Sequence, residues 1–200
     1  MNSHTTQRKI IPDSETIAAL PVFPLLGLGQ VDCVRTGAEA ERARTALMAA
    51  PTWGFDTESK PTFRVGEVSD GPHVVQLAIE GHAWVFLLHD PACVEVVAQL
   101  LATPILKAGF GLGDDCKRVR IRLGVDIPNV LELNQSMRQL GYRSEMGVKA
   151  SVAVLFGQRF AKSKKVSTSN WAQPELSPSQ LLYAANDAYA AWCVWRQLAA

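Results

Sequence analysis

The segment WGFDTES, from Trp53 to Ser59, places two acidic residues at the end of an apolar run. If this run is a β-strand, its side chains alternate between two faces, and Asp56 and Glu58 project from the same face. Two carboxylates held side by side repel each other unless a cation lies between them, and such hard oxygen ligands favour Mg²⁺ or Mn²⁺. The alternative is a strand that has already ended, with both acids solvated in a loop. The segment therefore indicates either a metal site or a polar turn.

The apolar runs around this segment predict a mixed sheet. Runs rich in Val, Leu and Phe occupy residues 53–57, 73–79 and 83–88, and glycine-containing turns separate them, as in an antiparallel meander. Strands expected at 105–109 and 129–133 alternate with stretches of helical periodicity. Three antiparallel strands followed by parallel strands indicate an α/β fold, with a five-stranded mixed sheet flanked by helices.

The regions outside these strands are expected to be mainly helical. A short strand at 31–35 leads into a helix that Pro51 ends. Residues 1–25 are polar and then interrupted by two prolines, which predicts a mobile N-terminal tail ahead of a single domain at 26–200. Further helical stretches are expected at residues 91–101, 114–123, 148–156 and 179–198.

Composition narrows the class of protein. The 200 residues are 48% hydrophobic, which fits one globular domain. The net charge is +1, so a polyanionic partner would have to be held by local patches or bound cations. The four cysteines show no C-x-x-C spacing, which argues against a zinc site or a disulfide framework. Because the N-terminus has no signal-peptide pattern, we expect a cytoplasmic protein without membrane association.

A second segment, KAGFGLGDDCKRV from Lys107 to Val119, turns through three glycines into two acids and a helix. Its G-x-G-x-G spacing does not match the G-x-G-x-x-G of a dinucleotide loop, and acids at the helix start would repel a pyrophosphate. Asp114 or Asp115 is expected to cap the helix by accepting hydrogen bonds from its free backbone N–H groups.

A third segment, LLYAANDAYAAW from Leu181 to Trp192, predicts an alanine-rich helix. Tyr183 and Asp187 are four residues apart and therefore share a helix face, so a phenol and an acid can point into one site. The alternative is a helix whose apolar residues face the core while Asp187 lies in water.

Taken in this order, the three segments resemble the DEDD superfamily of 3′-5′ exonucleases, tyrosine branch. The resemblance runs from about Thr52 to Leu198 and is greatest to the exonuclease domain of the Werner syndrome protein and its small stand-alone bacterial relatives. The sequence Ser169-Asn170-Trp171 is also similar. A histidine-branch member would carry His where Leu182 stands. Ser59 departs from the pattern, because Werner-type members often carry Trp there.

The resemblance implies an RNase H-like fold and a metal-dependent 3′-5′ exonuclease that releases nucleoside 5′-monophosphates from nucleic acid, with DNA favoured. It implies that Asp56 bridges two divalent cations, Mg²⁺ or Mn²⁺, while Glu58 and Asp187 complete one site and Asp115 supports the other. Two ions roughly 3.5 to 4 Å apart can stabilise both the attacking and the leaving oxygen. Tyr183, with an ordinary pKa of about 10, is expected to orient the attacking water.

Contacts to the substrate are expected from basic and aromatic side chains near these motifs. Basic residues can follow the phosphates, and phenylalanines can stack on the terminal base. The basic residues fit a solvated loop or helix face equally well, and a phenylalanine near a strand end more often belongs to the core. The expected contacts are Lys60, Phe63, Arg64, Phe110, Lys162, Lys164 and Lys165.

Two other functions remain open on the same fold. One is an exoribonuclease of the RNase D type, because family members share these acids while differing in substrate. The other is an inert nucleic-acid-binding module, since fold does not fix function. The presence of all four acids argues against the inert module.

Overall fold

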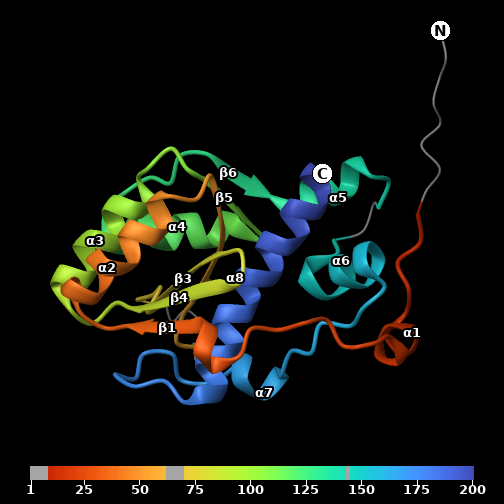
Figure 1. Cartoon of the computed structure of the whole chain (residues 1–200), viewed down its shortest axis with the longest axis horizontal. Helices are drawn as coiled ribbons and strands as arrows, with labels where there is room; N and C mark the ends of the chain where they lie inside the picture. Colours follow the sequence, from red (N-terminus) through yellow and green to blue (C-terminus); the bar gives the residue numbers. More distant parts are fainter. Residues whose placement is uncertain (1–8, 62–69, 143–144) are drawn as a thin grey trace, which may run out of the picture.

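A mixed β-sheet forms the centre of the computed structural model, which describes residues 9–61, 70–142 and 145–200 (Figure 1). Its strands within these residues are β1 (Val31–Val34), β2 (Thr52–Glu58), β3 (Val74–Ile79), β4 (His82–Leu87), β5 (Leu106–Gly109) and β6 (Val130–Glu132). They lie in the order β1-β4-β3-β2-β5-β6. β2, β3 and β4 form the predicted antiparallel meander, and β5 and β6 extend it in parallel.

The sheet has one strand more than the five predicted. The short strand expected ahead of the sheet is β1, which pairs parallel with β4 and becomes an edge strand. Val34 at its end is buried in the same apolar cluster as Trp84 and Phe86 of β4. Pairing satisfies backbone groups that β4 would otherwise leave exposed at its edge.

Helices cover both faces of the sheet (Figure 1). One face packs against α2 (Gly37–Met48), α3 (Pro91–Leu101) and α4 (Leu112–Leu123), and the other against the long helix α8 (Pro178–Ala199). Successive residues of β2 face these two layers of helices in turn. Phe55 belongs to the first apolar cluster, whereas Gly54 faces Ala188 of α8. The acids of β2 that share the parity of Gly54 therefore project toward α8.

The helix α8 carries the third predicted motif, and its start is well defined. Ser177 is the N-cap, its hydroxyl accepting a hydrogen bond from the backbone N–H of Gln180, and Pro178 is the first helical residue. Helices α5 (Leu133–Gln139) and α6 (Gly147–Phe156) pack on its other side. None of the helices in the described ranges combines the length and apolar character that a membrane crossing requires.

The start of α4 contradicts the capping prediction. Gly111 is the N-cap, with φ of 71°, and no side chain caps it. Instead, the Leu112 N–H donates a 2.8 Å hydrogen bond to Oε2 of Glu132, at the end of β6. Asp114 and Asp115 lie in the first turn, where acids suit the helix dipole. The carboxylate of Asp115 is therefore not used in capping α4.

The N-terminal segment contains α1 (Ser14–Ala19) and the 3₁₀ turn η1 (Leu28–Gln30), and between them it packs on the domain. The Phe23 ring lies 5.4 Å from that of Phe156. The side chain of Asn186 on α8 accepts a hydrogen bond from Leu26 N–H at 2.7 Å and donates one to its carbonyl at 3.2 Å. Mobility of residues 1–25 in solution stays a prediction.

Candidate metal centre

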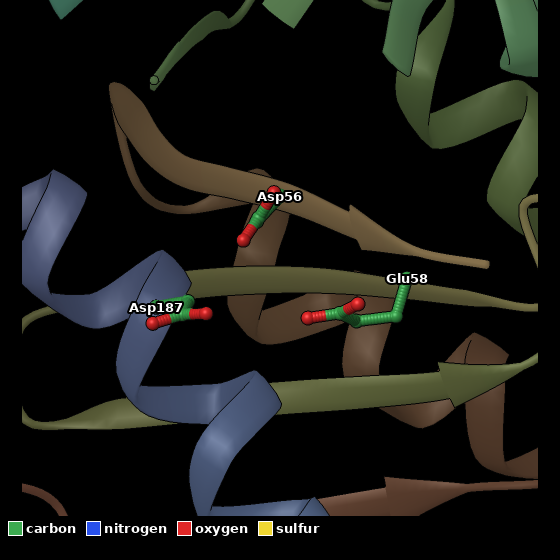
Figure 2. A group of neighbouring side chains, drawn as sticks. All are labelled: Asp56, Glu58 and Asp187. Atoms are coloured by element: carbon green, nitrogen blue, oxygen red, sulfur yellow. The ribbon is translucent and has the colours of Figure 1, made fainter. Parts of the chain in front are cut away.

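Three carboxylates from two elements meet at one point between β2 and α8. Asp56 and Glu58 come from β2 and Asp187 from α8, and one oxygen of each lies within 4.8 Å of the others. Figure 2 shows the Glu58 and Asp187 side chains turned toward each other, with Asp56 beside them. The alternation predicted for the strand is therefore present, and the loop alternative for the two acids is wrong.

Burial makes this arrangement costly without a cation. Burial raises the pKa of Asp56 well above its ordinary value, and the neighbouring Asp187, Asp115 and Glu58 carboxylates raise it further. Burial, followed by the charge of Asp187, raises the pKa of Glu58 to about 8. Burial likewise raises the pKa of Asp187 to about 6, against the opposing effect of Lys162. Three acids in this state favour any ligand that brings positive charge.

Asp187 is a buried acid whose carboxylate has few partners among the described residues. Its side chain is 3% exposed, and Lys162 Nζ lies 2.6 Å from its Oδ2. Apart from this ion pair, neither oxygen has a hydrogen-bond partner among the described residues. Buried carboxylate oxygens normally accept hydrogen bonds or coordinate metals. The donor set of three carboxylates fits a hard divalent cation such as Mg²⁺ or Mn²⁺.

Asp115 lies beside this cluster and is held differently. It comes from α4 on the opposite face of the sheet, and its Oδ1 accepts a 2.5 Å hydrogen bond from the hydroxyl of Thr57. Arg118 lies 3.8 Å from the same oxygen. Burial raises the pKa of Asp115, while the Thr57 hydroxyl lowers it. The fourth predicted acid is thus close enough to act on Asp56 but is not part of the three-acid group.

Tyr183 lies one turn before Asp187 on α8 and borders the same cavity. Burial, followed by the charge of Asp187, raises the pKa of its phenol to about 12. The Lys162 ammonium lies 4.7 Å from the centre of its ring. At neutral pH this side chain is a neutral hydrogen-bonding group rather than a base.

A cavity of about 500 Å³ opens over the acids and can admit a substrate. Of the predicted substrate contacts, Phe110 and Lys162 line it. Lys60, Lys164 and Lys165 are not among its lining residues in the described part of the chain, and Phe63 and Arg64 lie outside the described residues. Substrate contact by any of these side chains stays a prediction.

Two residues of the site were missed by the sequence analysis. Thr57 holds Asp115, and its only signal was its position between two acids on the strand. Lys149, in the first turn of α6, lines the cavity and lowers the pKa of Asp187 through its charge. Nothing in the local pattern distinguishes it from a solvated lysine.

Comparison with known proteins connects this site to a family. The family model described as 3′-5′ exonuclease matches residues 31–200. An Arabidopsis thaliana 3′-5′ exonuclease is 26% identical over 148 residues, which cover 72% of this chain and 51% of the relative. The Mus musculus bifunctional 3′-5′ exonuclease/ATP-dependent helicase WRN is 29% identical over 150 residues, covering 72% of this chain and 11% of the relative. The chain thus spans about half the length of the first of these relatives and about a tenth of the second.

Solved structures confirm the predicted RNase H-like fold. The EXO domain of Aedes aegypti Nibbler has a TM-score of 0.73 at 21% identity, covering 86% of this chain and 88% of that domain. Escherichia coli RNase D has a TM-score of 0.74 at 19% identity, covering 84% of this chain and 44% of that one. At these identities the likeness concerns the fold.

Proposed function

Because this chain belongs to the DEDD 3′-5′ exonuclease family, we propose that it removes nucleotides from the 3′ end of a nucleic acid and releases nucleoside 5′-monophosphates. The observation that carries the proposal is the convergence of Asp56, Glu58 and Asp187. Buried acids at such spacing are destabilising unless they serve a cation. An inert binding module on this fold would have no use for them.

The residues that would hold divalent cations are the three clustered acids, with Asp115 as the fourth. Two bound cations would supply charge stabilisation for the attacking and leaving oxygens of the phosphodiester and a lowered pKa for a bound water. The chain itself supplies the orienting groups. The neutral phenol of Tyr183 directs the attacking water by a hydrogen bond, and the ammonium of Lys149 meets the substrate phosphate across the cavity.

We assign the chain to the tyrosine branch of the family. Tyr183 stands four residues before Asp187, and Leu182 occupies the position at which the histidine branch would carry its base. With a pKa of about 12, the phenol is suited to hydrogen bonding rather than proton removal near neutral pH.

We propose DNA as the preferred substrate, on the resemblance of the three motifs to the Werner-type exonuclease domain. RNA is the second candidate. It is favoured by the fold similarity to Trypanosoma brucei RNase D, one structure of which is a complex with RNA U12 (TM-score 0.74, 20% identity, 92% of this chain and 64% of that one). The four acids serve either polymer, so the choice between them depends on contacts elsewhere in the cavity.

One assay tests activity, polarity and substrate together. DNA and RNA labelled at the 5′ end, single- and double-stranded, are incubated with Mg²⁺ or Mn²⁺. We expect a ladder that shortens from the 3′ end, fastest on DNA. Faster shortening of RNA would favour the RNase D alternative. No shortening of any substrate would contradict the proposed activity.

A matched pair of variants links the activity to the acid cluster. Asp56→Ala is expected to lose activity by about 10³-fold or more, because it removes a ligand shared by the site. Asp114→Ala is the control, since Asp114 is a neighbouring acid that is exposed and pairs with Lys117. Wild-type activity in Asp56→Ala would rule the scheme out.

A further inference from the structure

Lys162 is the cationic side chain that the structure places against the three clustered acids. Its Nζ lies 2.6 Å from Oδ2 of Asp187 and 4.7 Å from the centre of the Tyr183 ring. The sequence analysis expected this lysine to contact substrate phosphates. Its position on Asp187 indicates a different task, because a phosphate-binding lysine has no need to pair with a metal ligand.

The oxygen that Lys162 occupies is one that a metal would use. Asp187 belongs to the three-acid group, and the ion pair with Lys162 is the one contact given to its carboxylate by the described residues. An ammonium and a divalent cation on the same carboxylate oxygen repel each other strongly in a buried site. Binding of a divalent cation to this oxygen therefore competes with the ion pair.

The backbone around Lys162 is held in place while its side chain retains freedom. Arg159 exchanges two backbone hydrogen bonds with the N-terminal segment, to Pro21 at 2.8 Å and from Phe23 at 2.9 Å. The Lys162 carbonyl accepts a hydrogen bond from Lys149 Nζ at 3.5 Å. The Lys162 side chain is 26% exposed, compared with 3% for Asp187. Its ammonium can therefore leave Asp187 without moving the chain.

Lys162 also stands at a boundary between two cavities. Together with Tyr183 and Asp187 it lines the acid cavity of about 500 Å³ and a second cavity of about 400 Å³ beside Leu26 and Val166. Space thus adjoins the ammonium on both sides. The acid cavity is the more polar of the two, since Asp56 and Glu58 also line it.

We propose that Lys162 is an internal counter-cation, whose ammonium neutralises Asp187 and holds it beside Tyr183 until a divalent cation displaces it. This rests on the proposed function, since it needs the acids to bind metal. Lys162 acts here as a positioning residue through Asp187. The ion pair lowers the metal affinity of the site, because a cation that binds Asp187 must first separate Asp187 from Lys162. In support, the Asp187 carboxylate raises the pKa of Lys162 above its ordinary value even though burial alone would lower it.

Calorimetric titration with Mn²⁺ at about pH 8, without nucleic acid, tests the exchange. Lys162→Met is expected to bind Mn²⁺ about 5-fold or more tightly than wild type, since no ammonium has to leave. Lys162→Arg keeps the charge and is expected to bind Mn²⁺ less tightly than Lys162→Met, because a cation still has to leave Asp187. Lys164→Met removes an exposed charge two residues away and is expected to leave Mn²⁺ affinity within about 2-fold.

Thermal unfolding in EDTA gives an independent measurement. Lys162→Met is expected to unfold at a lower temperature than wild type, and Mn²⁺ is expected to raise its unfolding temperature more than that of wild type. Lys162→Gln, which also lacks the charge, gives the same comparison should Lys162→Met be too unstable to titrate. Equal Mn²⁺ affinity and equal unfolding temperatures in wild type and the uncharged variants would overturn the counter-cation role alone. Failure of wild type to bind Mn²⁺ would overturn the proposed function with it.

Discussion

The carbonyl oxygen of Ala188 lies where a side chain on Gly54 would have to go, since a Cβ built on Gly54 would stand 1.9 Å from it. The same Cβ would stand 2.9 Å from Cβ of Trp192. The backbone of α8 therefore rests directly on β2, one residue after Asp187 and two residues before Asp56. This close approach fixes how near the acid of the helix comes to the acids of the strand.

Replacing Gly54 by Ala should therefore damage both stability and the metal centre. A methyl group at this position forces α8 away from β2, and we expect the free energy of unfolding to fall by roughly 1 to 3 kcal/mol. Mn²⁺ affinity should fall with it, because Asp187 moves with the helix. Calorimetric titration and urea unfolding measure the two effects. Gly113→Ala is the control, since a Cβ there meets nothing within 4 Å; wild-type Mn²⁺ affinity in Gly54→Ala would contradict this account.

Thr57 should matter through Asp115 rather than through packing. Thr57→Val keeps the shape of the side chain but removes the hydroxyl that donates to Asp115 at 2.5 Å. Leaving a buried carboxylate without this bond is expected to cost about 1 to 3 kcal/mol of stability and about 10-fold in exonuclease rate. Thr57→Ser keeps a hydroxyl and should retain most of both. Full activity in Thr57→Val would show that Asp115 does not need the hydrogen bond from Thr57.

The raised pKa values predict how stability without metal changes with pH. Glu58 and Asp187 bind protons in the folded protein up to about pH 8 and 6, whereas in the unfolded chain they lose them near pH 4. The folded state therefore holds more protons, and in EDTA the free energy of unfolding should fall as pH rises from about 4.5 through 8, by on the order of 2 kcal/mol.

Two comparisons test this pH dependence. Glu58→Gln should flatten the stability profile, whereas the exposed Glu175→Gln should not change it. Added Mn²⁺ should restore stability most strongly at the high end of the range, where the carboxylates are ionised and free of protons. A wild-type profile that rises between pH 4.5 and 8 in EDTA would be the opposite of this expectation.

Lys107 of β5 should be a source of instability at neutral pH. It is fully buried, and its Nζ donates to the Thr103 carbonyl at 2.5 Å, with no acid paired to it among the described residues. Burial lowers its pKa from 10.5 to about 8, so folding works against its charged form. Lys107→Met should raise the free energy of unfolding at pH 7 by roughly 1 to 3 kcal/mol.

The size of this effect depends on pH. Because the folded pKa of Lys107 is depressed, the wild-type protein gains stability as pH rises from about 8 toward 10.5, and the advantage of Lys107→Met should shrink over that range. Lys117→Met, at an exposed position of α4, should stay within about 0.5 kcal/mol of wild type throughout. A destabilised Lys107→Met at pH 7 would contradict this, and would mean that the Thr103 oxygens and the Trp53 ring compensate for burying the ammonium.

The local pattern predicted the strand but left open whether it continues through the first two acids. If it does, alternation places Asp56 and Glu58 on one face, and the family resemblance adds Asp187 to them. The role of Asp115 in the site stays a prediction, and its bond to Thr57 depends on α4 crossing the opposite face, which no local pattern specifies. The capping prediction for α4 was wrong because the acceptor comes from Glu132, twenty residues away. The pairing of Lys162 with Asp187 likewise joins segments distant in sequence.

The contact between Leu26 and Asn186 shows that the folded domain of this enzyme includes residues ahead of the part that its family shares. The family match begins at residue 31, yet the peptide group of Leu26 is bound on both sides by the side chain adjacent to Asp187. A protein shortened to the shared region would leave the buried side-chain amide of Asn186 without these two hydrogen bonds, next to Asp187. Anyone trimming this chain for crystallisation should therefore keep the residues from Phe23 onward.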